Sequence, residues 1–222
     1  TSINETLEFK DNLYDDINSI KENFPRKFFP EDVNLYVTNI AVRDLDQLAG
    51  LYQESFKDNF DEQSMSIFEN CVIHLLDFLA NPISPLNNEL ISNILTASIT
   101  LCEQSALTKD SWESDFNEFA SKETGLSASF TIRDEVAELV NAFEIPQLET
   151  SFELIVGYLS NNSSHLSADK IESALYLLQC LMNVEDDFSN TSLVPSLIEF
   201  IKSMLSQQNT LDQMSQIRLL LL

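Results

Sequence analysis

Apolar side chains recur along this chain with the 3.6-residue period of amphipathic helices. The clearest stripes are formed by Ile171, Ala174, Leu175, Leu178, Leu181 and Met182, and by Ile132, Val136, Leu139, Val140 and Phe143. Polar residues fill the positions between them. The pattern predicts a chain made of helices that each bury one face.

Capping residues mark where several helices should begin. Ser2 with Glu5, and Thr210 with Gln213, have the spacing of a capping box, and Ser167 can cap the helix that follows it. Together with the apolar stripes, these signals predict ten helices, over residues 2–22, 31–42, 44–60, 62–80, 86–105, 109–121, 129–143, 146–160, 167–183 and 192–207. An eleventh helix is predicted to begin at Thr210.

One segment, residues 35–42, has the β-branched and aromatic composition of a strand. We assign it to a helix, because no second segment is available to pair with it. The chain also contains only 3 glycines. A sheet protein of this length would need more of them for hairpin turns and bulges.

The spacing of the helices indicates a repeat. From residue 62 onward they are predicted to form hairpins whose second helices begin near 86, 129, 167 and 210, intervals of 43, 38 and 43 residues. Two helices per period of about 40 residues is typical of HEAT repeats. We therefore predict an all-α HEAT-repeat α-solenoid, a right-handed superhelical stack of antiparallel helix pairs, with about five repeats. A single solenoid would span 1–222, with repeats near 1–60, 62–105, 109–143, 146–183 and 192–222.

The last six residues are apolar apart from Arg218. Because a terminal repeat needs a polar outer face, we expect the chain to be a fragment of a longer solenoid.

Charge narrows the possible partners. The 222 residues include 36 acidic and 12 basic ones, for a formal net charge of −24. A free polyanion such as DNA would be repelled, whereas cationic partners would be attracted. No direct nucleic acid contact is therefore expected. Membrane insertion is not expected either, since no apolar run reaches the length of a spanning helix.

The residues that usually carry chemistry are sparse. The chain has 2 histidines, His74 in an apolar helical run and His165 in a polar loop, and neither has a metal-ligand companion four residues away. No phosphate-binding glycine loop or nucleophile motif is present. We predict no enzyme activity, no cofactor and no metal, and we interpret His74 as a structural residue.

Three cysteines, Cys71, Cys102 and Cys180, lie far apart within apolar patterns. They are predicted to be packed thiols rather than disulfide or zinc ligands, which indicates a reducing compartment, the cytosol or nucleus.

The single tryptophan, Trp112, lies in the predicted helix 109–121. Trp112, Phe116 and Phe119 share one helical face, and this stripe is either part of the core or an exposed aromatic patch for a partner.

The same segment carries a family resemblance. Residues 112–119, the loop 120–129 and the helix start Phe130-Thr131-Ile132-Arg133-Asp134 resemble the karyopherin-β (importin) family, and look closest to its importin-9 / karyopherin-114 branch. Residues 172–180 resemble the following repeat of that branch. The resemblance covers about 112–183, a third of the chain.

The resemblance implies a nuclear transport receptor that shuttles between cytoplasm and nucleus through the nuclear pore. It also implies the partners of such a receptor: the GTPase Ran, Phe-Gly nucleoporins and basic protein cargo such as histones or TATA-binding protein. In this branch the loop matching 120–129 is often strongly acidic. Here it holds one acid and one base, Glu123 and Lys122, which argues against a charge-driven role.

The acidic charge independently favours a surface for basic cargo. The candidate contact residues are acids near the starts of the predicted second helices and in the loops before them: Glu118, Glu123, Asp134, Glu135, Glu138, Asp169 and Glu172. Their alternative interpretation is a solvated helix face. Two other functions also remain open, a HEAT-repeat scaffold or adaptor subunit and a histone chaperone without a transport role.

Overall fold

The computed structural model describes residues 2–24, 30–58, 61–81, 85–115, 117, 130–162, 166–184, 193–206 and 211–222. Across these ranges every regular element is helical. The helices are α1 (Ile3–Asn23), α2 (Glu31–Leu51), a π-helical turn η2 (Tyr52–Phe56), α3 (Glu62–Ala80), α4 (Asn88–Leu101), α5 (Ala106–Ser114), α7 (Ile132–Asn141), α8 (Ile145–Asn162), α9 (Ala168–Asn183), α10 (Val194–Ser206) and α11 (Gln213–Leu221).

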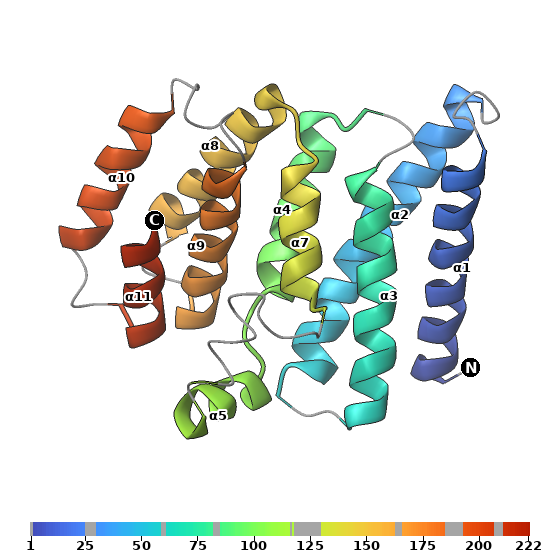
Figure 1. Cartoon of the computed structure of the whole chain (residues 1–222), viewed down its shortest axis with the longest axis horizontal. Helices are drawn as coiled ribbons and strands as arrows, with labels where there is room; N and C mark the ends of the chain where they lie inside the picture. The colour runs from blue at the N-terminus through green and yellow to red at the C-terminus, as the bar shows by residue number, and fades with distance from the viewer. Residues whose placement is uncertain are drawn as a thin grey trace. The chain divides into compact units, whose positions relative to one another are not determined.

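The chain divides into two compact units, residues 1–139 and 140–222. In the first unit α1 lies along α3, α2 lies along α4, and α2 also packs on α3 (Figure 1). In the second unit α9 lies along α11, and α8 and α10 pack on α9 and α11 respectively. Each unit is thus built from helices paired in two layers, which confirms the predicted all-α, HEAT-like fold class. The repeat boundaries and the superhelical hand stay predictions.

Several helix starts follow the predicted capping chemistry. Ser2 and Glu5 form the capping box of α1, with both reciprocal hydrogen bonds present. The Ser167 side chain accepts a hydrogen bond from the N–H of Lys170 at the start of α9. At α11 the prediction was wrong: the helix begins at Gln213 and Asp212 is its N-cap, accepting hydrogen bonds from the N–H groups of Met214 and Ser215. An aspartate caps a helix as well as a threonine does, so the motif alone did not fix the start.

A second prediction, which concerns α2, was also wrong. Residues 31–42 and 44–60 were predicted to form two helices, but the structure has one continuous helix over Glu31–Leu51, which includes the segment 35–42. It ends in η2, where the Tyr52 hydroxyl donates to the backbone oxygen of Glu103 (2.6 Å) and Gln53 donates to its carboxylate (2.7 Å). Lys57 pairs with the same carboxylate. The π-helical turn thus brings Tyr52, Gln53 and Lys57 to the same residue, Glu103.

The cores hold the predicted apolar stripes. In the first unit Phe68, Leu75 and Ile94 are fully buried, and in the second Leu148, Leu175 and Leu178 are. Cys71, Cys102 and Cys180 are buried thiols that form no disulfide bond in the described part of the chain, as predicted. Trp112 is half-buried, whereas Phe116 and Phe119 lie outside the described residues.

Candidate partner-binding surface

The start of α7 is fixed by short polar contacts. The carboxylate of Asp134 accepts hydrogen bonds from the N–H and the hydroxyl of Thr131, each 2.8 Å long. The Thr131 hydroxyl oxygen in turn accepts from the N–H of Asp134 (3.2 Å). The Arg133 guanidinium donates through Nε (3.0 Å) and Nη2 (2.6 Å) to the carbonyl oxygen of Cys102, just after α4. These contacts set the direction in which Glu135 and Glu138 project from α7.

Glu135 is buried on α7, with 6% of its surface exposed. Burial, followed by the negative charges of Asp77, Glu138 and Asp134, raises the pKa of its carboxyl to about 7, while His74 opposes the shift. Half of the molecules therefore carry a protonated Glu135 near neutral pH. A carboxyl in this state can change its charge when a charged group approaches.

Helix α3 contributes His74 and Asp77, whose charges act on Glu135 and which lie three residues apart and so share one face. The Nδ1 atom of His74 lies 2.7 Å from a carboxylate oxygen of Asp11, and its Nε2 atom lies 4.0 Å from one of Asp15. His74 is half-buried, with 36% of its side chain exposed. His165 lies outside the described residues.

Helix α1 is held beside α3 by two further bonds to backbone oxygens. Asn18 donates to the carbonyl oxygen of His74 (2.9 Å) and Lys21 to that of Phe78 (3.1 Å). The Lys21 ammonium also lies 4.5 Å from the centre of the Phe78 ring. The positions of the Asp11 and Asp15 carboxylates relative to His74 are therefore fixed by side chains that bridge the two helices.

We call the charged groups linked by these contacts, or by their electrostatic effect on Glu135, the acidic band. It contains five carboxyl groups and one imidazole from α1, α3 and α7: Asp11, Asp15, His74, Asp77, Glu135 and Glu138. Charges of one sign gathered on neighbouring helices create a local potential that attracts the opposite charge. The acidic band can therefore attract cationic groups. No set of three or more His, Cys, Asp or Glu side chains in the described ranges is arranged to hold a metal ion.

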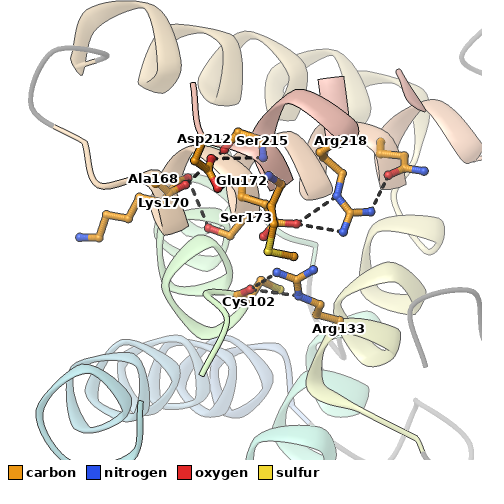
Figure 2. A network of polar contacts seen from close by, with 11 residues as sticks. Cys102, Arg133, Ala168, Lys170, Glu172, Ser173, Asp212, Ser215 and Arg218 are labelled. Carbon is orange, nitrogen blue, oxygen red and sulfur yellow. Dashed lines mark hydrogen bonds and ion pairs between the residues drawn. The ribbon is translucent and has the colours of Figure 1, made fainter. Parts of the chain in front are cut away.

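Glu172, another predicted contact residue, has a different environment in the second unit. Only 3% of its surface is exposed, and one carboxylate oxygen accepts hydrogen bonds from Nε (3.1 Å) and Nη2 (2.9 Å) of Arg218 (Figure 2). Arg218 also donates to Gln179 (2.9 Å) and lies 5.1 Å from the centre of the Tyr176 ring. Glu172 thus joins α9 to α11 through a buried ion pair.

The structure places the other predicted residues as follows. Glu138 is exposed on α7, Asp134 is half-buried and caps that helix, and Asp169 is half-buried in the first turn of α9. Glu118 and Glu123 lie outside the described residues. Among the described residues, the acids predicted as contacts therefore include one exposed side chain, two half-buried ones and two buried ones.

Sequence reasoning missed Asp11, Asp15 and Asp77. Asp11 and Asp15 are four residues apart on α1, and His74 and Asp77 are three apart on α3, so each pair is visible as a helical spacing. Nothing in the sequence says that the faces they mark lie side by side. That adjacency comes from the packing of α1 on α3.

Within the described ranges, no helix is long and apolar enough to cross a membrane. A search of protein-family models gives no match for the chain.

A curated protein does show similarity. The chain is 30% identical over 199 residues to importin subunit beta-5 of Saccharomyces cerevisiae, which covers 89% of this chain and 20% of that protein. This similarity supports the karyopherin-β family. The helical pairs described above agree with it, since the predicted family is built of HEAT repeats. The chain spans about a fifth of the length of this importin, and the predicted importin-9 / karyopherin-114 branch stays a prediction.

Proposed function

We propose that this chain is part of a nuclear transport receptor and that its acidic surface binds basic protein cargo, histones or a protein like TATA-binding protein, for Ran-dependent import. The observation that carries the proposal is the similarity to importin subunit beta-5 over 89% of the chain. The net charge of −24 and the acidic band agree with a basic partner. In this proposal the whole receptor shuttles between cytoplasm and nucleus, binds Ran and Phe-Gly nucleoporins, and has no enzyme activity.

The contact residues proposed from the sequence can now be ranked by accessibility. Glu138 is exposed and so accessible to a partner, whereas Asp169 is half-buried. Glu172 already pairs with Arg218 inside the fold. To the sequence-predicted set we add Asp11, Asp15 and Asp77, because they lie on the same band as Glu138.

Magnitudes limit what the chain does alone. An exposed ion pair contributes about 0–1 kcal/mol, whereas nanomolar affinity requires about 12 kcal/mol. A handful of such pairs gives weak, salt-sensitive binding. Tight binding would need further contacts from the rest of a longer receptor.

Binding of a core histone dimer to the full chain tests the cargo part of the proposal. We expect the dissociation constant, measured by fluorescence anisotropy, to rise steeply between about 20 mM and 150 mM salt, because the ions screen exposed charges. Glu153, an exposed acid on α8 outside the band, provides the control: Glu153→Gln should bind as the wild type does. Binding that is indifferent to salt would contradict an electrostatic surface.

Ran-GTP and Phe-Gly peptide pulldowns with the full-length receptor test the transport part. A transport receptor retains both, whereas a HEAT-repeat scaffold or adaptor subunit, the second candidate, retains neither. The observation that favours the second candidate is the fold itself, since helix pairs of this kind also build scaffolds.

A histone chaperone without a transport role is the third candidate, and the acidic charge favours it equally. It would shield histones from non-specific DNA whether or not Ran-GTP is present. Release of the histones by Ran-GTP would instead support import.

A further inference from the structure

One buried acid differs from all the others in the described ranges. Asp44, Glu103, Glu135 and Glu172 are the acidic side chains buried there. Three of them pair with a basic side chain: Asp44 with Lys10 (2.7 Å), Glu103 with Lys57, and Glu172 with Arg218 (2.9 Å). The carboxyl group of Glu135 has no hydrogen bond or ion pair among the described residues, although its backbone N–H donates to the carbonyl oxygen of Thr131 (3.1 Å). It is therefore a buried carboxyl group that no cation of the described residues pairs with.

The groups around Glu135 cannot supply that cation permanently. Asp77 on α3, and Glu138 and Asp134 on α7, are acids. His74 on α3 is the one basic group acting on it, and its imidazole already lies against Asp11 and Asp15 of α1. Arg133, two residues away on α7, directs its guanidinium to the carbonyl oxygen of Cys102.

We propose that Glu135 is the anchor for a lysine or arginine side chain of the basic partner, and that it releases its proton when that side chain binds. The inference rests on the proposed function, because it needs a basic protein partner. The O–H bond of the Glu135 carboxylic acid breaks, the proton goes to solvent, and the carboxylate accepts hydrogen bonds from the ammonium or guanidinium. The incoming positive charge replaces the lost proton, so the buried site stays neutral.

A partner bound in this way would bind more tightly as the pH rises. Because the pKa of Glu135 is raised to about 7, its proton must be removed at pH 6 but is already absent at pH 8. For one linked proton, the affinity should increase about tenfold between these two pH values. His74 acts electrostatically on Glu135, so a variant of His74 serves as a separate check.

Isothermal titration calorimetry of the full chain at pH 7 tests the proposal, with a capped peptide of alternating lysine and glycine as the probe. Repeating the titration in buffers of different ionisation enthalpy gives the number of protons released. We expect the wild type to release about half a proton per bound peptide. Glu135→Gln should release none and should lose the increase in affinity with pH.

Two further variants test whether the released proton comes from Glu135. Glu138→Gln removes a carboxylate from the same helix face but an exposed one, so it should bind more weakly and still release the proton. His74→Gln removes the imidazole that acts on Glu135 and should also keep the release. Loss of release in His74→Gln with retention in Glu135→Gln would overturn the inference.

The outcomes also separate the inference from the proposed function. A wild type that does not bind the peptide at low salt would overturn both. Binding without proton release, or with equal pH dependence in wild type and Glu135→Gln, would overturn the inference alone. If Glu135→Gln fails to fold, carboxyl ¹³C NMR of the wild type replaces it: the pKa of Glu135 should fall when the peptide binds, and an unchanged value would overturn the inference.

Discussion

Two glutamates, Glu135 on α7 and Glu172 on α9, were grouped by sequence reasoning, and both are buried in the structure, at 6% and 3% exposure. Glu172 lies in the second unit and accepts two hydrogen bonds from the Arg218 guanidinium. Glu135 lies in the first unit and faces mainly other acids. The two residues have the same side chain and similar burial but opposite electrostatic surroundings.

The comparison shows that burial alone does not decide the role of a carboxylate. A buried charge with a countercharge inside the chain holds two helices together. A buried carboxyl without one has a raised pKa, as Glu135 does, and can respond to a cation from outside. We therefore assign Glu172 to the stability of the second unit, whereas partner binding by Glu135 stays a proposal.

Breaking the ion pair between Glu172 and Arg218 should have the largest effect on stability. Glu172→Gln would leave Arg218, which is 9% exposed, buried without its countercharge. We expect a loss of about 3–5 kcal/mol in the free energy of unfolding, measured by urea denaturation. Glu199→Gln breaks an exposed ion pair with Lys202 in the same unit and should cost at most about 1 kcal/mol. Equal losses in the two variants would remove the distinction drawn for Glu172.

The carboxyl group of Glu135 should make the free energy of unfolding depend on pH. Since the pKa of Glu135 is raised from 4.5 to about 7 on folding, the folded state holds the proton more tightly than the unfolded state. The stability that this group contributes is fully present below pH 4.5 and is lost as the pH rises through 7. Between these limits the wild type should lose about 3 kcal/mol relative to Glu135→Gln. Urea unfolding of both proteins across this pH range measures the difference, and parallel curves would show that Glu135 is not perturbed.

A smaller effect distinguishes the helix cap from its exposed neighbour on α7. Asp134→Ala removes the carboxylate that binds Thr131, so it should lower the free energy of unfolding by about 1 kcal/mol. Glu138→Ala removes an exposed side chain and should change it by less than about 0.5 kcal/mol. Thermal denaturation of the two variants tests this order, and the reverse order would argue that Asp134 is open to a partner instead.

Helix type and the apolar faces were predictable because both depend on local spacing. The capping box at Ser2 and the Ser167 cap were found from a few neighbouring residues, and the structure confirms them. Prediction was weakest where two local signals compete. Asp212 and Thr210 can both start α11, and only the folded chain shows that Asp212 does.

The candidate site was predictable only in part, because its members come from different helices. Sequence reasoning found Glu135 and Glu138, which share a face of α7. It could not find that His74 and Asp77 lie against that face, or that Asp11 and Asp15 lie against His74. It also could not pair Glu172 with Arg218, which is 46 residues away.

The sequence by itself determined that this protein is helical, acidic and similar to the karyopherin-β family, since each of these follows from residue types and their spacing. The tertiary structure alone decided which of its carboxylates have a cation beside them. A charge is stabilised or destabilised by the groups within a few ångströms of it, and the packing of distant segments determines those neighbours.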